Sequence, residues 1–474
     1  MRDLSACPLN VNATTDANDN KQRREDFSEY FTPAIKCVVD FAKATRPTKV
    51  FERTTESRSA EWFGDFKLAE PDFDWSYLGD PSNADAIHKN IENRKAEGDI
   101  WNVIQLRQKF LAEKDETVKE KIRQKLLKAA LEIPNSSHPN SPVGDETSAR
   151  VLKTFGIKRN FSFPPKSALE LGESFGLLRA RNVVLTTGER TYYFIDDLAL
   201  LEQALVKFTI HRLLKQGFKL ISVPDLIHPG VIEGAGFPTT GERTQVYSLD
   251  PNLHSQACLS GTAEMPLAGF FAGETLKAEE GPQKLCAVSR CYRAETSNLS
   301  EERGIYRVHQ FTKVEMFAVV CDTETTQSDA VLQEFVGIQH RLFSELGLHC
   351  RILEMPSEEL GAPAYRKYDI EAWMPNKEMW GEISSASNCT DFQSRRLCMK
   401  FLSKTGGEKY VHTVNGTACA VPRLIIAVLE NLQNEDGTVQ LPESLWPYMN
   451  GVRKLRDKRT KLPHHTWQKK SLKR

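Results

Sequence analysis

The sequence has no apolar run approaching the roughly 18 residues that a transmembrane helix needs, so we expect none. Its ten cysteines form no Cys-x-x-Cys pair, and no histidine stands at a metal-ligand spacing from them. We therefore expect buried free thiols in a reducing compartment rather than a structural zinc site. The sequence also lacks a GxxxxGK[ST] loop and a GxGxxG after a strand, which argues against P-loop and Rossmann nucleotide sites. Net charge is zero, so binding to nucleic acid would need a local basic cluster.

The length of 474 residues allows two or three domains, and shifts in composition indicate where they begin. Residues 10–20 are polar and typical of disorder, whereas residues 34–53 mix apolar and basic side chains, faintly as in a mitochondrial presequence. We predict an N-terminal extension over residues 1–57, a helical arm domain over 58–134, a mixed domain over 135–450 and a basic tail over 451–474.

A charged stretch over residues 84–133, which contains no proline, predicts an arm of two antiparallel helices. We expect a short turn near Asp115, a break at Gly98 and an end at Pro134. A narrow apolar seam between charged faces suits a projecting arm, and the alternative is a helical hairpin packed on the body. The seam residues are Ile87, Ile91, Ile100, Val103, Ile104, Phe110, Leu111, Val118, Ile122, Leu126, Leu127 and Ala130.

Beyond the turn-rich segment 134–144, the pattern becomes a mixture of helices and strands. Asp196 or Asp197 is the expected cap of the first helix. The strands cluster as neighbouring hairpins with few helices between them, which predicts an α+β fold with an antiparallel sheet. We predict helices over residues 196–215, 330–346 and 422–433, and strands over 219–224, 365–373 and 379–385.

One hairpin is unusually charged for its position. Apolar, β-prone residues at 285–290 and 314–320 predict two strands, and the loop 297–303 between them is polar. We place Arg293 and Glu295 just inside the first strand, where residues two apart share a face. Further charges, at Arg307, Lys313 and Glu315, fall on the second strand. Such a face is either solvated or holds a charged ligand.

Several segments in a fixed order resemble a known family. They are the strand ending at Pro224, segment 261–264 (Gly-Thr-Ala-Glu), the charged hairpin, segment 381–388 (Gly-Glu-Ile-Ser-Ser-Ala-Ser-Asn) and segment 415–423 with its helix. Together they resemble the three motifs of class II aminoacyl-tRNA synthetases, and within that class the seryl-tRNA synthetases. The resemblance covers residues 58–450. It implies a class II antiparallel sheet flanked by helices, with residues 58–134 as the helical-hairpin arm and 135–450 as the catalytic domain.

The resemblance implies a reaction in which serine and ATP form seryl-adenylate, and the seryl group then passes to the 3′ end of tRNA. It assigns Arg293 to the α-phosphate and the serine carboxylate, and Arg307 and Arg423 to the outer phosphates, so Arg293 and Arg423 are the catalytic residues. Planar, permanently charged guanidinium groups suit this task. The ATP-binding set is Arg293, Ala294, Glu295, Arg307, Phe311, Glu382, Ile383, Ser384, Ser385 and Arg423. Phe311 is to stack on adenine, Glu295 to lie near its amino group, and Glu382 and Ser385 to hold Mg²⁺.

The resemblance also assigns a serine site. Glu264 with Thr262 is to accept the ammonium group, and Glu315 with Thr417 nearby is to bind the hydroxyl. A buried carboxylate that expects a hydroxyl penalises alanine, because its polar group is then left unpaired. No nucleophile is needed, so we interpret catalysis as positioning plus charge stabilisation. The full set is Thr262, Ala263, Glu264, Glu315, Asn415 and Thr417, of which position 417 is commonly Ser in the family. The alternative is that these two residues bind no ligand: Glu264 then only caps its segment, and Arg423 is an arginine on the surface.

The implied partners are L-serine, tRNA(Ser) and a second copy of the chain, with tRNA(Sec) left open as another acceptor.

A short arm and a basic tail resemble the metazoan mitochondrial branch, which implies the mitochondrial matrix, with the cytoplasm as the alternative. The tail is either a phosphate-contacting patch or a solvated segment. Two other functions compete: an inactive paralogue, and a class II ligase for another amino acid. The basic tail residues are Arg453, Lys454, Arg456, Lys458, Arg459, Lys461, Lys469, Lys470, Lys473 and Arg474.

Overall fold

The computed structural model describes residues 68–457, apart from 181–183, 242–243, 251–256, 279–280, 296–303, 323 and 405. The predicted N-terminal extension, the start of the arm domain, the hairpin loop 297–303 and tail residues 458–474 lie outside the described residues. In the part described, no helix combines the length and apolar character needed to cross a membrane. All eight cysteines described there are free thiols; six are buried as predicted, whereas Cys321 and Cys398 are only partly buried.

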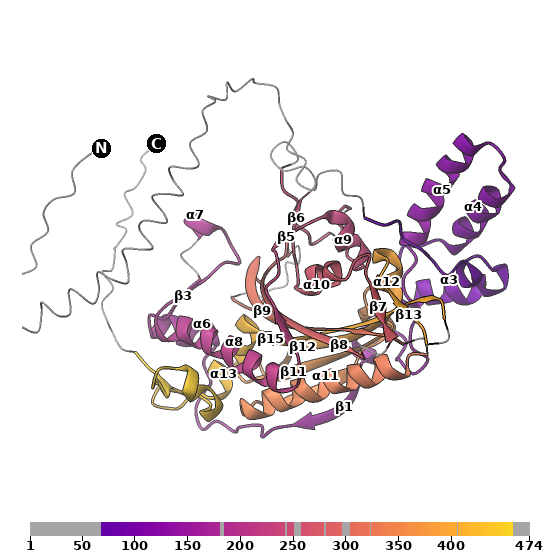
Figure 1. Cartoon of the computed structure of the whole chain (residues 1–474). Helices are drawn as coiled ribbons and strands as arrows, with labels where there is room; N and C mark the ends of the chain where they lie inside the picture. Colours follow the sequence, from indigo (N-terminus) through magenta and orange to yellow (C-terminus); the bar gives the residue numbers. More distant parts are fainter. Residues whose placement is uncertain are drawn as a thin grey trace, which may run out of the picture. The chain divides into compact units, whose positions relative to one another are not determined.

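An eight-stranded sheet forms the centre of the fold (Figure 1). Neighbouring strands are antiparallel except for β4 and β8, which run parallel. The predicted antiparallel α+β fold is thereby confirmed. In spatial order the strands are β1 (Arg150–Phe155), β10 (Cys350–Glu354), β11 (Arg366–Met374), β12 (Met379–Thr390), β15 (His412–Ala420), β9 (Gln310–Val320), β8 (Gln283–Tyr292) and β4 (Lys219–Ile221).

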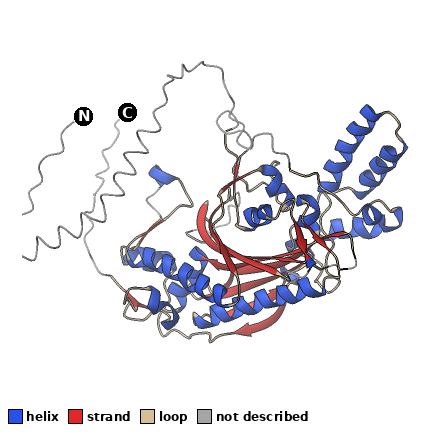
Figure 2. Ribbon diagram, in the orientation of Figure 1, coloured by secondary structure: helices blue, strands red, loops and turns tan. Residues whose placement is uncertain are grey.

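Helices cover both faces of this sheet (Figures 1 and 2). On one face lie α8 (Asp197–Lys215), α11 (Thr326–Glu345) and α13 (Val421–Asn431), which enclose the largest apolar core. On the other lie α9 (Pro229–Gly234), α10 (Glu264–Phe270) and α12 (Phe392–Leu397). The shorter elements are α6 (Ala168–Ser174), α7 (Val184–Thr187), β2 (Leu178–Arg179), β3 (Tyr193–Phe194), β5 (Leu226–Ile227), β6 (Cys258–Leu259), β7 (Thr275–Lys277), β13 (Lys400–Leu402), β14 (Glu408–Tyr410), β16 (Val439–Gln440) and β17 (Lys454–Leu455).

Strand β9 shows how sequence alternation separates the two faces. Met316 and Ala318 belong to the core with α8, α11 and α13, whereas Phe317 and Val319 pack in the smaller core beside α10. Because side chains alternate along a strand, Lys313 and Glu315 share the face of Phe317. Both charged side chains are buried there. The strand therefore places a charged pair between an apolar core and the segment that leads into α10.

The predicted arm is present and has its own apolar core. Helix α3 (Ala84–Asn93) precedes α4 (Ile100–Ala112) and α5 (Glu116–Leu131), which pack against each other. Asp115 caps α5 by accepting from the backbone N–H groups of Thr117 and Val118, which confirms the turn. In Figure 1, α4 and α5 project away from the sheet. The predicted seam is wrong at the tip, where Leu111 and Val118 are exposed because no third element covers the turn.

Three local predictions also need correction. Strand β8 ends at Tyr292 and β9 begins at Gln310, so Arg293, Glu295 and Arg307 all lie outside the strands. Glu295 has a positive φ of 44°, so it does not share a strand face with Arg293. Asp196 stands at the N-cap of α8 with a φ of 48°, and its side chain makes no capping hydrogen bond there.

The predicted boundary of the tail also differs from the fold. Strand β17 begins at Lys454 and pairs with β16, so the first residues of the predicted tail belong to the folded body. The first predicted strand is likewise shorter than 219–224, because β4 already ends at Ile221.

Candidate active site

A cavity of about 250 Å³ opens on the sheet face that carries α10 and α12. Most of the predicted ligand-binding residues line it, although they come from five separate parts of the chain. Ala263, Ala294 and Arg307 do not line it. The predicted residues that do are Thr262, Glu264, Arg293, Glu295, Phe311, Glu315, Glu382, Ile383, Ser384, Ser385, Asn415, Thr417 and Arg423.

One network in the cavity centres on Arg423, which projects from the first turn of α13. Its Nη1 lies 3.1 Å from the Glu382 carboxylate and donates to the Glu382 carbonyl oxygen at the same distance. The guanidinium also stacks 4.5 Å from the centre of the Tyr306 ring. Burial raises the pKa of Glu382, but Arg423 and then Lys367 outweigh it and bring the pKa to about 2. Glu382 is therefore a carboxylate at neutral pH, and Arg423 is not a surface arginine.

A second network lies on β9. The Lys313 ammonium forms an ion pair with Glu315 and donates to the hydroxyls of Thr262 at 2.7 Å and Thr417 at 3.3 Å. The Thr417 hydroxyl in turn donates to Glu315 at 3.2 Å. Lys313 and Glu315 are only 5% and 1% exposed, so each charge depends on the other for compensation. This network holds two hydroxyls and a carboxylate at one wall of the cavity.

Glu264 sits beside that network, at the start of α10. Gln393 donates to one carboxylate oxygen at 2.7 Å and Asn415 to the other at 3.0 Å. Thr413 donates to Gln393 Oε1, which fixes the orientation of the amide. Burial, followed by the nearby Glu315, raises the pKa of Glu264 to about 7. Two neutral amide donors thus fix the Glu264 carboxylate without neutralising its charge. A carboxylate held in this way can accept a cationic group from a ligand.

Arg293 lies between the two networks. Its guanidinium is 5.3 Å from the centre of the Phe311 ring, and its Nε donates to the Gly261 carbonyl oxygen at 3.3 Å. Its positive charge favours ionisation of both Glu264 and Glu382. A ligand that fills the cavity would therefore contact Arg293, which is one of the lining residues.

The remaining predicted residues form the rim near Arg293. Glu295 is buried, and Arg307 lies 3.5 Å from its carboxylate. Arg307 does not line the cavity itself, but its contact with Glu295 holds it next to the cavity. Within the described residues no group of three or more His, Cys, Asp or Glu side chains is placed to hold a metal.

Four polar residues that hold or pair with the charged groups of the site are absent from the predicted set: Lys313, Gln393, Tyr306 and Lys367. Lys313 had a signal, since it stands two residues before Glu315 on one strand and must share its face. Lys367 faces Asp369, whose carboxylate it contacts at 2.9 Å, and the same alternation along β11 identifies that pair. Gln393 and Tyr306 had none, because tertiary packing alone brings them to Glu264 and Arg423.

Comparison with known proteins places this geometry in context. A family model described as the tRNA synthetase class II core domain (G, H, P, S and T) matches residues 247–432. The mitochondrial serine–tRNA ligase of Mus musculus is 47% identical over 328 residues, which cover 69% of this chain and 63% of that protein. The chain thus spans less than two thirds of that relative. The serine–tRNA ligase of Treponema denticola is 37% identical over 413 residues, covering 77% of this chain and 96% of that protein.

Solved structures show the same similarity. Seryl-tRNA synthetase from Pyrococcus horikoshii complexed with ATP matches with a TM-score of 0.68 at 31% identity, covering 79% of this chain and 88% of that one. The cytoplasmic serine–tRNA ligase of Naegleria fowleri in complex with AMP matches with a TM-score of 0.72 over 83% of this chain, and at 24% identity it supports the fold alone.

Proposed function

Because the chain belongs to the seryl-tRNA synthetase family, we propose that it activates L-serine with ATP and transfers the seryl group to tRNA(Ser). The observation that supports this most strongly is the cavity itself. Buried carboxylates with hydroxyl and amide partners stand on one side of it, an arginine–carboxylate pair stands on the other, and Arg293 lies between them. That order of charges matches an amino acid joined to a nucleotide phosphate.

On the ATP side, Arg423 and Arg293 would stabilise negative charge as the serine carboxylate displaces pyrophosphate from the α-phosphate. Preorganised cations in a half-enclosed site are worth more than the same charges in water. Phe311 would support adenine, with Glu295 at its amino group. Arg307 is held near this end through Glu295 and would bind an outer phosphate. No step requires a nucleophile from the protein.

On the serine side, Glu264 would pair with the ammonium group and Glu315 would accept a hydrogen bond from the hydroxyl. Lys313 is not free to bind ligand, because it already contacts Glu315, Thr262 and Thr417. We assign it the task of holding those three groups in place. An amino acid without a hydroxyl would leave Glu315 short of a partner, which disfavours alanine.

The donor set fits Mg²⁺ brought in with ATP. Glu382 is ionised at neutral pH, and Ser385 adds a hydroxyl to the same wall. One carboxylate and one hydroxyl, completed by phosphate oxygens and water, match the oxygen preference of this ion. When bound, the ion would neutralise part of the phosphate charge.

Serine-dependent exchange of labelled pyrophosphate into ATP tests the proposed function without tRNA. We expect exchange with serine and far less with alanine or threonine. Absence of exchange with serine in a folded preparation would favour the inactive paralogue. Exchange that responds better to another amino acid would favour a different class II ligase.

The pKa of Glu264 predicts a pH dependence of serine binding. A carboxyl pKa raised to about 7 means that the empty site is protonated below that pH. Because the ammonium group of serine pairs with the ionised form, binding must release the proton. The serine KM should rise by up to about tenfold for each pH unit below 7 and become level above it. The Glu264→Gln variant should bind serine weakly, and its serine KM should not change with pH. A serine KM that does not change with pH in the unaltered protein would contradict the role of Glu264.

The relatives support our proposals for the tRNA partner and the compartment. The projecting helices α4 and α5 would contact tRNA(Ser), and tRNA(Sec) is a second acceptor to test. We propose the mitochondrial matrix because mitochondrial ligases of Mus musculus and Bos taurus resemble the chain at 47% and 48% identity. Imaging of the tagged full-length protein would separate this location from the cytoplasm.

An apolar groove of about 570 Å³ supports a homodimer. It lies where β4 closes the sheet, and Ile221, Val223, Val231 and Pro266 help to line it. Phe270 stands at the groove with 58% of its surface exposed. An exposed apolar groove beside a terminal strand suits a partner of the same kind, since a second copy would cover it.

Phe270→Glu should shift the protein from dimer to monomer, because the carboxylate would have to be desolvated in the interface. Light scattering after size exclusion measures the mass. Leu111→Glu is the matched control, since Leu111 is 69% exposed at the tip of the arm. A variant at Phe270 that stays dimeric would place the interface elsewhere.

A further inference from the structure

The strip 361–364, between η5 (Ser357–Glu359) and β11, forms part of the cavity wall. Gly361, Pro363 and Ala364 line the cavity directly. The strip has no strand or helix of its own, so its position depends on the bonds that its backbone makes with other segments.

Two residues from the N-terminal side of the chain make those bonds. Arg94, at the end of α3, donates to the carbonyl oxygens of Gly361, Ala362 at 3.3 Å and Ala364 at 3.0 Å. The Asn135 side chain donates to the Pro363 carbonyl oxygen at 2.9 Å. Every carbonyl of the strip therefore accepts a hydrogen bond from Arg94 or Asn135.

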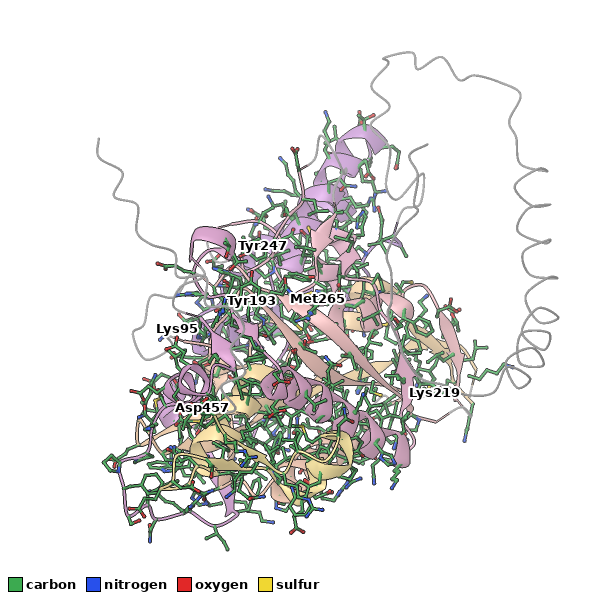
Figure 3. The ribbon with its side chains drawn as sticks, turned by 90° about the vertical axis from the view of Figure 1, so that its left-hand side faces the viewer. Lys95, Tyr193, Lys219, Tyr247, Met265 and Asp457 are labelled. Carbon is green, nitrogen blue, oxygen red and sulfur yellow. The ribbon has the colours of Figure 1, made fainter. Side chains whose placement is uncertain are left out.

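Further contacts join the end of α3 to η5. The Ser357 hydroxyl donates to the Asn93 carbonyl oxygen at 2.6 Å, and Lys95, labelled in Figure 3, pairs with Glu358 at 2.5 Å. Arg94 itself is 7% exposed, and its other amino group contacts Ser136 and Ser137 at 3.4 and 3.3 Å. Burial lowers the pKa of Arg94 to about 10, so it stays charged at neutral pH. A buried guanidinium bound mainly by carbonyl groups is a fixed part of the structure.

The strip touches the serine side of the cavity rather than the phosphate side. Pro363 lies against Gly236, where an added methyl group would come within 2.9 Å of the ring. The preceding Ala235 carbonyl accepts from Gln393, the amide that holds Glu264. Asn135 also donates to the Cys389 carbonyl, and the Cys389 thiol contacts Asn415, the second donor to Glu264. Displacement of the strip would reach Glu264 through both of its amide partners.

We propose that Arg94, with Asn135, is a positioning residue that holds the strip 361–364 as the wall of the serine pocket, so that the base of the arm domain shapes amino-acid binding. This inference rests on the proposed function, because it concerns binding of serine at the same site. Arg94 contacts no substrate and acts through the strip.

Arg94→Lys tests the proposal, since lysine keeps the charge but has one nitrogen, so it cannot bind the strip carbonyls and hold Ser136 and Ser137 at the same time. We expect the serine KM in pyrophosphate exchange to rise about tenfold, with the ATP KM and kcat changed by less than about twofold. Hydrogen exchange at the amides of residues 362 and 364–366 should become faster. Lys95→Met is the matched control: it removes only a neighbouring ion pair whose lysine is 70% exposed, and both readouts should stay unchanged.

Two results would overturn the positioning role of Arg94. One is an equal rise in the KM for serine and the KM for ATP, and the other is faster amide exchange with an unchanged KM for serine. If Arg94→Lys does not fold, Asn135→Ala provides the second variant, and the same selective rise in serine KM is expected. Failure of the proposed function is distinguishable. The unaltered protein would then show no serine-dependent exchange, whereas slow amide exchange in the strip would still depend on Arg94.

Discussion

Arg423→Ala should lower serine-dependent pyrophosphate exchange by at least about 10³-fold while leaving the fold intact. Arg423 is the cation closest to Glu382, and it lies over Tyr306 at the phosphate end of the cavity. Removal of one preorganised charge-stabilising group costs about 10²- to 10³-fold in other enzymes. Here the change also leaves Glu382 without its main counter-charge, which raises the pKa of that carboxyl and weakens its hold on a cation.

Arg423→Lys should recover little of this loss, because an ammonium cannot contact Glu382 and stack on Tyr306 at once. Arg212→Ala is the matched control. Arg212 also pairs with a glutamate, Glu345 at 2.7 Å, but on the partly exposed surface of α8 and α11. Surface pairs contribute about 0–1 kcal/mol, so exchange should be unchanged. Near-normal exchange in Arg423→Ala would remove Arg423 from the proposed mechanism.

Lys313→Met should be the most destabilising single change in the site. It leaves Glu315 buried without a counter-charge, close to the second buried carboxylate of Glu264. Breaking a buried ion pair by removal of one partner costs about 3–5 kcal/mol in the free energy of unfolding. Serine-dependent exchange should also be lost, because Thr262 and Thr417 lose the donor that holds their hydroxyls.

The double variant Lys313→Met with Glu315→Leu separates these two effects. Replacement of a whole buried pair by apolar side chains of similar size is often neutral for stability or better. We therefore expect the midpoint of urea unfolding to return to that of the unaltered protein, while exchange remains absent because Glu315 is gone. Lys400→Met, which removes an ion pair between β13 and β14 whose carboxylate is half exposed, should change neither quantity. Recovery of exchange in the double variant would exclude Glu315 as the partner of the serine hydroxyl.

Much of the site could be predicted because its motifs are contiguous and local. Segment 381–388 lies on one strand, β12, and segment 415–423 runs from β15 directly into α13. A motif confined to one or two elements keeps its side chains in a fixed relation once those elements form. The conformation of the charged hairpin was harder to predict from the sequence. The chain leaves the strand after Tyr292, and no sequence pattern indicates the positive φ at Glu295.

The sequence by itself determined the order of helices and strands, the face of β9 that carries Lys313 and Glu315, and the membership of the family. Alternation and helical spacing are local properties, so they survive without knowledge of the partners. Only the tertiary structure decided that Gln393 fixes Glu264, that Arg423 stacks on Tyr306, and that Arg94 holds a wall of the cavity more than 250 residues further along the chain. Those contacts join segments with no shared periodicity. They arise because buried charges and carbonyl groups must find partners wherever the packed chain brings them together.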